Sequence, residues 1–170
     1  MKRITNKILK LSPFEALDRI DFEILEALQK NARLSNKELA AKVKLAPSSC
    51  LQRVRRLDKA DVLKGYHAEL EPKALGIGLQ SIVAVRLKRH SRNLFRTLHA
   101  HLLSLPEVLS IYHVAGANDL LVDVAVRDSN HLRDMIVDEF AIRPEVDRTE
   151  TALIFSYSKK PLLPNYRPKE

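Results

Sequence analysis

Apolar residues recur at helical spacing in two short stretches near the start of the chain. The first stretch covers about residues 18–31, and its apolar face consists of Ile20, Ile24, Leu25 and Leu28. Ser35 and Glu38 have the S-x-x-E spacing of a capping box, which marks a helix start by satisfying free N–H groups. The helix that follows carries the apolar residues Leu39, Ala40 and Val43. The pattern therefore predicts two short helices, with a turn at residues 44–46.

A third helix is predicted from Pro47, because proline suits the first turn of a helix, where its missing N–H costs nothing. Its apolar residues are Cys50, Leu51, Val54 and Leu57. Its polar residues are Ser49, Gln52, Arg53 and Arg56. At roughly 100° per residue, the two sets point about 140° apart. Such a helix can dock on its apolar side and read base edges with its polar side, or it can be a surface helix whose basic side is hydrated.

Three short helices, the third of them polar and basic, favour the first possibility and predict a helix-turn-helix domain. Arg53 and Arg56 would then face DNA from the recognition helix. The N-terminus of the second helix would meet phosphate groups, which sense no sequence. The candidate DNA contacts are Ser35, Asn36, Lys37, Pro47, Ser48, Ser49, Gln52, Arg53 and Arg56.

The chain beyond the third helix indicates where the first domain ends. Residues 62–70 are predicted to form a strand or a short hairpin. Residues 71–78 include Pro72, Gly76 and Gly78, which interrupt regular structure, and they are interpreted as a linker. The predicted organisation is a basic N-terminal extension (1–14), a DNA-binding domain (15–70), a linker (71–79), an effector and oligomerisation domain (80–158) and a C-terminal tail (159–170).

The second half of the chain alternates between strand and helix periodicity. The predicted strands cover residues 81–87, 108–114, 120–126 and 149–157. The last strand would present on one face Thr151, Leu153, Phe155 and Tyr157. Amphipathic helices are predicted over 94–105 and 132–140. The order βαββαβ is the ferredoxin-like arrangement, an antiparallel sheet with both helices on one face. The other face also carries apolar side chains, so we expect a second subunit to cover it.

Charge and composition narrow the class of partner. The chain of 170 residues has a net charge of +8; residues 1–70 hold 15 Lys and Arg against 9 Asp and Glu, whereas residues 71–170 hold 14 against 12. A basic first domain beside a nearly neutral second one predicts double-stranded DNA or another polyanion as the partner of the first. The single cysteine, Cys50, fits a reducing cytosol. No stretch has the length of a membrane span or a signal peptide, so we expect a cytoplasmic, nucleoid-associated protein.

Motifs for catalysis or metal binding are absent from the sequence. The histidines show no H-E-x-x-H or Cys/His ligand spacing and are interpreted as surface or interface residues. No Ser/His/Asp motif, P-loop or dinucleotide fingerprint is found either. Asp123 and Asp138 are interpreted as hydrated positions on a strand and a helix. We therefore expect no enzyme activity, no cofactor and no metal. The six histidines are His67, His90, His99, His101, His113 and His131.

Several short motifs follow one another between about Leu17 and Tyr157. They are D-x-x-D-x-x-I-L from Asp18, S-N-x-E-L-A from Ser35, R-V-R-R-L from Arg53, G-Y from Gly65, E-P-x-x-L-G from Glu71 and H-V-x-G-x-x-D-L-L from His113. Together they resemble the Lrp/AsnC family of bacterial and archaeal transcription regulators. The resemblance implies an α+β protein, with an N-terminal winged helix-turn-helix domain followed by a ferredoxin-like (RAM-type) regulatory domain. It also implies dimers that assemble further into rings or octamers.

The resemblance also implies an effector site. Family members often bind an amino acid near a Gly-x-x-Asp turn where two dimers meet, and the matching residues here are Gly116 and Asp119, with Asn118 beside them. The glycine would let a ligand approach the backbone, and Asp119 would accept from an ammonium group. Alternatively, the segment is a simple hairpin turn, which Asn and Asp favour in any case. Ala115 and Ala117 replace a Thr and an acidic residue of many members, so the effector is not specified.

Two further departures concern the helix ends. Ala46 stands where the family usually has a capping Ser, so the cap is expected at Ser48 or Ser49. Ser49 and Gln52 would then form a second capping box and compete with base contacts. Asp61 replaces a frequent Gly at a position where left-handed backbone is expected, and Asp tolerates that conformation better than most residues.

The sequence thus predicts a sequence-specific, homo-oligomeric transcription regulator, modulated by an amino acid or a related small molecule. Two alternatives remain open. One is an architectural DNA-binding protein of the nucleoid that needs no effector. The other is an amino-acid-binding module whose basic domain is incidental.

Overall fold

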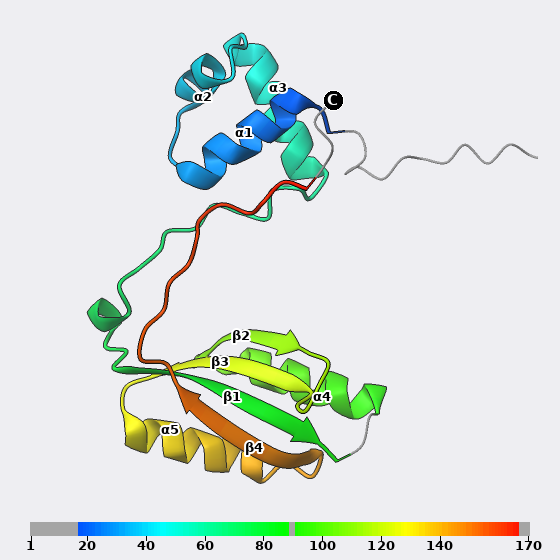
Figure 1. The fold of residues 1–170 in the computed structure, drawn as a ribbon, viewed down its shortest axis with the longest axis vertical. Coiled ribbons are helices and arrows are strands. Elements are labelled where there is room, and N and C mark those ends of the chain that lie inside the picture. Colours follow the sequence, from blue (N-terminus) through cyan, green and yellow to red (C-terminus); the bar gives the residue numbers. More distant parts are fainter. Residues whose placement is uncertain (1–16, 89–90, 167–170) are drawn as a thin grey trace, which may run out of the picture. The chain divides into compact units, whose positions relative to one another are not determined.

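The computed structural model describes residues 17–88 and 91–166, which divide into two compact units (Figure 1). The first unit comprises the described residues up to Ala68 together with those from Lys159 onward, and the second comprises Glu69–Ser158. Within the first unit, the N–H of Leu163 donates to the side chain of Gln29 at 2.8 Å. The C-terminal segment therefore contacts α1. The N-terminal extension predicted over 1–14 lies outside the described residues.

The first unit is a bundle of three helices, α1 (Arg19–Lys30), α2 (Asn36–Lys42) and α3 (Pro47–Lys59). The predicted apolar faces meet in its core, with one exception. Leu51 is 38% exposed, because it lies one residue, or about 100°, around the helix from the buried Cys50. The buried core residues are Ile24, Leu28, Leu39, Ala40, Val43, Cys50 and Leu57.

The helix starts agree only in part with the prediction. The capping box of Ser35 and Glu38 opens α2 as predicted, and a second one, formed by Asp18 and Asp21, opens α1. The predicted cap of α3 is wrong. This helix begins at Pro47 with Ala46 in the N-cap position, and no side chain among the described residues caps it.

The serines of α3 lie within its first turn, because the helix begins before them. Ser48 and Ser49 therefore cannot occupy the N-cap position, and the capping box expected from Ser49 and Gln52 does not form. Both serines are exposed. Their hydroxyl groups are consequently placed where an external partner can reach them.

Helix α3 ends in a Schellman motif, in which the residue after the C-cap takes up a left-handed conformation. That residue is Asp61, with φ 57°, as predicted. The N–H of Val62 donates to the carbonyl of Leu57 at 3.0 Å, and the N–H of Asp61 donates to that of Asp58 at 3.0 Å. Val62 also packs on the core that contains Leu57. The motif fixes the direction in which the chain leaves the bundle.

Helix α2 ends in the same motif, which the sequence did not predict. Lys44 is left-handed, with φ 54°, and the N–H of Leu45 donates to the carbonyl of Ala40 at 2.9 Å. Lysine has no intrinsic preference for this conformation. The turn between α2 and α3 is therefore held by its hydrogen bonds and by Leu45, which packs against the core.

The strand or hairpin predicted over residues 62–70 does not form. None of these residues belongs to a strand, and Tyr66 and Leu70 are exposed. Gly65 has φ 151°, a conformation that interrupts an extended strand. The chain then forms the short 3-10 helix η1 (Pro72–Leu75), which already belongs to the second unit.

The second unit is a four-stranded antiparallel sheet with the order β2-β3-β1-β4. This is the predicted ferredoxin-like arrangement, so the predicted fold class is confirmed for this unit. The last helical turns differ from the prediction, because α5 continues as the π-helical segment η2. The strands are β1 (Leu79–Leu87), β2 (Val108–His113), β3 (Leu120–Val126) and β4 (Val146–Leu153). The helices are α4 (Arg92–Ser104), α5 (Ser129–Met135) and η2 (Ile136–Ala141).

Strand β4 lies earlier in the chain than predicted. It ends at Leu153, and Phe155 and Tyr157 are 96% and 69% exposed. Beyond Leu153 only the N–H of Ile154 still bonds to the neighbouring strand, at the carbonyl of Gln80. The register of the two strands places Phe155 opposite Leu79, the first residue of β1, so the pairing ends where β1 begins.

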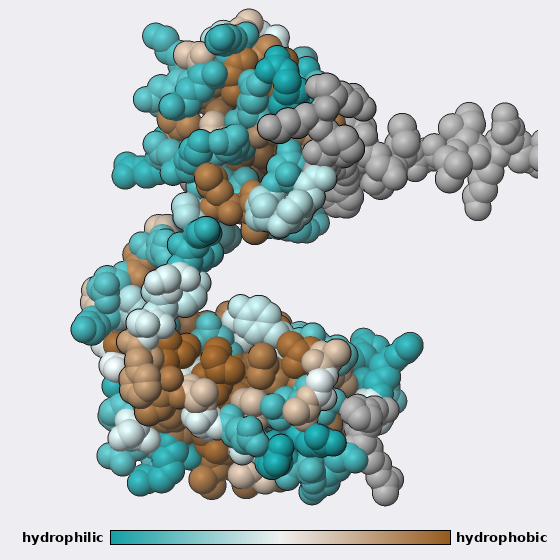
Figure 2. Space-filling view, viewed as in Figure 1, coloured by the Kyte–Doolittle hydropathy of each residue, from teal (hydrophilic) through white to brown (hydrophobic). Residues whose placement is uncertain are grey.

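Both helical segments cover the same face of the sheet. There, buried valines and leucines of β1 and β3 pack against Leu98, Leu102, Leu132 and Phe140. The opposite face carries alternate residues of the same strands, which no helix of this unit covers. Figure 2 shows hydrophobic residues gathered on the second unit and hydrophilic residues around them. By strand register, this open face includes Ile82, Ala84, Tyr112, Leu121, Asp123 and Ala125.

The left-handed residue at the end of α3 generates a stability prediction. We expect Asp61→Gly to raise the unfolding free energy of the first unit by roughly 0.5–1 kcal/mol, because glycine adopts this conformation without strain. The exposed ion pair with Lys64 that is lost contributes little. Ala41→Gly, inside α2, is the matched control and should lower stability by about 1 kcal/mol. Urea unfolding followed by circular dichroism measures both; a destabilised Asp61→Gly variant would contradict the strain argument.

Candidate nucleic-acid interface and ligand site

The polar side of α3 forms one continuous surface. Ser49, Gln52, Arg53 and Arg56 together line an open hollow of about 360 Å³. They come together because residues three, four and seven positions apart lie on the same side of a helix. The predicted recognition residues of α3 are thus side by side, and Pro47 and Ser48 precede them in the first turn.

Both arginines of this surface form ion pairs with α1 and the residue that caps it. Arg53 Nη1 lies 2.6 Å from Oδ2 of Asp18 and 2.9 Å from Oδ1 of Asp21. Arg56 Nη2 donates to Oδ2 of Asp21. The side chain of Asp21 is completely buried, whereas those of Arg53 and Arg56 are 26% and 53% exposed. The guanidinium groups are therefore held from behind while part of each remains accessible.

These contacts shift the ionisation of the groups that take part. Burial acts to raise the pKa of Asp18, but hydrogen bonds from Arg53 and from the N–H of Asp21 outweigh it and hold that pKa below its ordinary value. Hydrogen bonds to Asp18 and Asp21 raise the pKa of Arg53. Each shift favours the charged form of its group, so the ion pair between Asp18 and Arg53 is intact at neutral pH.

The residues predicted at the N-terminus of α2 have different environments. The Asn36 side chain donates to the carbonyl of Pro47 at 2.8 Å and so ties the start of α2 to the start of α3. Its Oδ1 is buried, with no hydrogen-bond partner among the described residues. The Ser35 hydroxyl accepts from the N–H of Glu38 at 3.3 Å as part of the cap. Lys37 is exposed.

The predicted effector turn lies between β2 and β3. The carboxylate of Asp119 accepts from the N–H of Leu87 at 2.8 Å, and its own N–H donates to the carbonyl of Val85 at 2.9 Å. Asp119 therefore fastens the turn to the end of β1. This is a structural contact that the spacing of the turn motif did not indicate.

The other residues of the turn are more open. Gly116 has φ 132°, and a Cβ added there would meet no atom within 4 Å. Arg86 Nη1 donates to the carbonyl of Ala117 at 2.9 Å, which braces the turn from β1. Asn118 is half-buried. The backbone at Gly116 is thus accessible, while the two ends of the turn are fixed.

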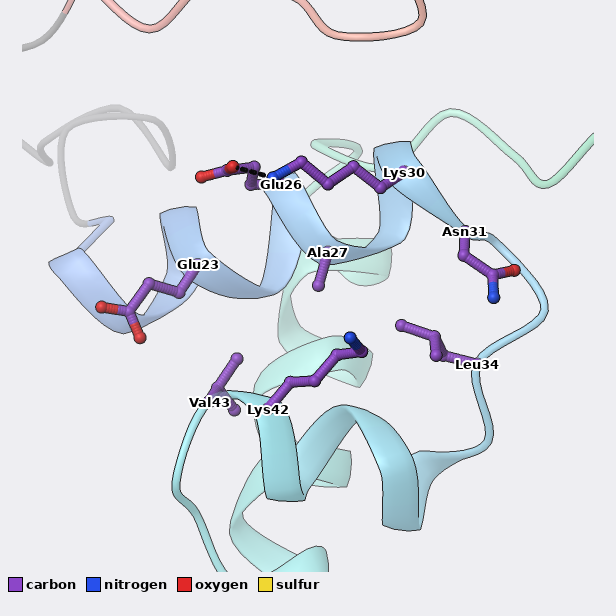
Figure 3. A pocket seen from close by; sticks show the side chains of 8 residues that line it. All are labelled: Glu23, Glu26, Ala27, Lys30, Asn31, Leu34, Lys42 and Val43. Atoms are coloured by element: carbon purple, nitrogen blue, oxygen red, sulfur yellow. Dashed lines mark hydrogen bonds and ion pairs between the residues drawn. The ribbon is translucent and has the colours of Figure 1, made fainter.

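A second hollow in the first unit lies between α1 and α2 (Figure 3). Its volume is about 370 Å³. The methyl-bearing side chains of Ala27, Leu34 and Val43 point into it from α1, the following turn and the end of α2. Charges of both signs surround it, and Glu26 pairs with Lys30. Because these charges balance, the hollow offers no selectivity for an anion or a cation.

Other kinds of site find no support among the described residues. No group of three or more His, Cys, Asp or Glu residues in 17–88 and 91–166 is placed to hold a metal ion. No helix in these ranges is long and apolar enough to cross a membrane. Burial raises the pKa of the Cys50 thiol, which keeps it protonated and unreactive. Cys50 is a packing residue of the three-helix core.

Comparison with known proteins identifies the family to which the chain belongs. Residues 17–64 match the family model of the winged helix-turn-helix DNA-binding domain, and residues 80–162 match that of the Lrp/AsnC ligand binding domain. The chain is 40% identical over 141 residues to the HTH-type transcriptional regulator AldR of Mycolicibacterium smegmatis, covering 83% of this chain and 82% of that protein. It belongs to the Lrp/AsnC family.

Two further relatives support the assignment. The leucine-responsive regulatory protein of Escherichia coli is 34% identical over 151 residues, which cover 89% of this chain and 92% of that protein. A crystal structure of a transcriptional regulator from Neisseria meningitidis in complex with L-Met is similar with a TM-score of 0.79 and 31% identity, covering 85% of this chain and 93% of that one. The chain is therefore a DNA-binding transcription regulator of the Lrp/AsnC type and not an enzyme.

Within this Lrp/AsnC chain, the main residues that sequence reasoning missed are Asp18 and Asp21. Their D-x-x-D spacing was noted as a motif, and the same spacing indicates a capping box. Their contacts with Arg53 and Arg56 span more than 30 positions, so no local pattern reveals them.

Proposed function

We propose that this regulator reads its operator with the polar side of α3 in the major groove. The observation that carries the proposal is the gathering of Ser49, Gln52, Arg53 and Arg56 on one open surface. Arginine binds guanine edges, glutamine binds adenine edges, and serine hydroxyls bond to either kind of base. The flanking groups would meet phosphates, which set the register on the duplex. These are Ser35, Asn36, Lys37, Pro47 and Ser48.

The regulator would also respond to an amino acid at the turn between β2 and β3. The accessible backbone at Gly116 supports this proposal, as does the L-Met complex of the Neisseria regulator. Asn118 and the carboxylate of Asp119 would supply polar groups for the ligand. Because Asp119 also holds the end of β1, a ligand there would act on the end of a central strand of the sheet.

The assembly that would respond is a homodimer, or a higher oligomer such as an octamer, built on the open face of the sheet. Ile82, Ala84 and Leu121 lie on this face, and no helix of the unit covers them. Asp123 lies among them: one of its oxygens is buried without a hydrogen-bond partner in the described part of the chain. Burial also raises its pKa. A second subunit would cover the apolar residues and could supply the missing donor.

Ligand binding would then shift the population of assemblies and change the spacing of the recognition helices on DNA. With chromosomal DNA as its proposed partner, the protein would act in the cytoplasm, at the nucleoid. The effector-independent architectural protein is the second candidate, because Ala115 and Ala117 leave the turn with few polar side chains. The two candidates predict different results with a pool of random duplexes: the regulator enriches one sequence from the pool, whereas the architectural protein enriches none.

The arginines of α3 provide the first test. From a randomised duplex pool, the wild-type chain should enrich a sequence, called here the selected duplex. Arg53→Ala and Arg56→Ala should each weaken its binding by roughly 1–3 kcal/mol, with less loss on a shuffled duplex. Lys37→Ala should weaken both duplexes alike. Titrations at fixed salt measure this; arginine variants that bind the selected duplex like wild type would refute the proposed interface.

The open sheet face provides the second test. We expect light scattering at micromolar concentration to give at least twice the chain mass of 19.4 kDa. Leu121→Arg, on that face, should shift the protein toward the monomer, because a buried unpaired charge is costly. Leu163→Arg, in the exposed C-terminal segment, serves as the control. A wild-type mass of about 19.4 kDa would exclude the proposed dimer.

The effector turn provides the third test. A thermal-shift screen of the twenty amino acids should identify a ligand, and Asp119→Ala should weaken its binding about ten- to a hundredfold in calorimetry, since a charge-assisted bond is worth roughly 1.5–3 kcal/mol. DNA affinity without ligand should change little. Gly116→Ala is a second variant that adds bulk where the backbone is accessible. Unchanged ligand affinity in both variants would place the site elsewhere.

A further inference from the structure

We propose that Asp21 is a positioning residue for DNA recognition: it orients Arg53 and Arg56 toward the bases. It thereby favours binding to a specific base sequence over non-specific attraction to phosphate groups. The inference rests on the proposed contacts of α3 with DNA. It assigns a selective role to a carboxylate that itself touches no DNA, since its side chain is completely buried. Asp18 assists by holding Arg53 from a second side.

The geometry of the carboxylate supports this role. Oδ1 of Asp21 accepts from Arg53 at 2.9 Å, and Oδ2 accepts from Arg56 and from the N–H of Asp18, the latter at 3.1 Å. One group thus holds two arginines that lie three positions apart on α3. A fourth bond, from the N–H of Asp21 to Oδ1 of Asp18 at 2.9 Å, fixes the carboxylates to the start of α1.

The ion pairs leave donors for DNA. The contacts with the carboxylates use one terminal nitrogen of each arginine, Nη1 of Arg53 and Nη2 of Arg56. A guanidinium group carries five N–H donors, so each arginine keeps others for a base edge. Because the side chains are already held in one conformation, less conformational entropy is lost when DNA binds.

The same carboxylates reduce attraction to DNA in general. Two negative charges stand beside two guanidinium groups, so the field that draws any phosphate toward α3 is weaker than the arginines alone would give. Hydrogen bonds from the arginines to base edges depend on the direction of the donors rather than on net charge, so the neighbouring carboxylates do not weaken them in the same way. Removing the Asp21 charge should therefore strengthen binding to any duplex and reduce discrimination between sequences.

The test compares the selected duplex with its shuffled version. For Asp21→Asn, we expect affinity for the shuffled duplex to rise and the ratio of the two dissociation constants to fall about tenfold. The dependence of log affinity on log salt should steepen by about one, as a released arginine neutralises a phosphate. Matched controls are Glu23→Gln and Glu26→Gln, which remove the same charge from α1 but pair with Arg19 and Lys30 on that helix. Their ratios should stay within about twofold of wild type.

A second variant separates positioning from folding. Asp18→Asn keeps an N-cap, because Asn caps helices as well as Asp does, but loses the ion pair with Arg53. Its ratio should fall in the same direction by about threefold, and circular dichroism reports whether each variant is folded. If Asp21→Asn does not fold, Asp18→Asn decides the question.

Three outcomes would overturn the inference. Asparagine variants that keep the wild-type ratio, while Arg53→Ala and Arg56→Ala lose it, would leave the α3 interface standing and remove the positioning role. Equal weakening of both duplexes by folded asparagine variants would show a structural role only. If the arginine variants bind like wild type, the proposed interface fails and the inference fails with it.

Discussion

A carboxylate without access to water lies between α1 and α3, and the arrangement of the first unit depends on it. An isolated buried charge is too costly to keep, so Asp21 requires cationic partners with good geometry. Arg53 and Arg56 meet this need only when α3 turns this side toward the N-terminus of α1. The apolar stripe alone would allow α3 some rotation about its axis. The ion pairs remove that freedom, and they thereby set which side chains face outward for DNA.

The second unit depends on a different constraint, the imbalance between the two faces of its sheet. One face is filled by α4, α5 and η2, and its valines and leucines are buried. On the other face, Ile82 of β1 lies opposite Asp123 of β3, and Leu121 lies two residues before Asp123 on the same strand. One oxygen of Asp123 is buried without a hydrogen-bond partner in the described part of the chain, and a carboxylate enclosed in a dry apolar contact is costly unless it is hydrogen-bonded. Its position favours a covering surface that is apolar but contains a hydrogen-bond donor.

Much of this architecture could be predicted from the sequence, because periodicity reports burial directly. The spacing of apolar residues predicted the three helices of the first unit, the order βαββαβ of the second unit, and apolar residues on both faces of its sheet. The failures occurred where a partner decides the structure. Residues 62–70 have the composition of a strand but pair with no strand among the described residues, and β4 ends at Leu153, close to the point where its neighbour β1 begins. Lys44 is left-handed because of bonds around it, and Leu51 is exposed because Cys50 and Leu57 set the buried direction.

The sequence predicted which residues form the candidate sites, but not the hydrogen bonds that hold those residues in place. The reason is the same in both units. The spacing of Gly116 and Asp119 indicated a ligand turn, yet the Asp119 carboxylate bonds to the N–H of Leu87, a residue 32 positions away. The stripe of α3 indicated arginines facing DNA, yet both are held by α1. In each case an acidic residue of a family motif stabilises the frame from which neighbouring groups act. A ligand that engages the Asp119 carboxylate would therefore change the frame as well as the contact, because the same group holds the end of β1.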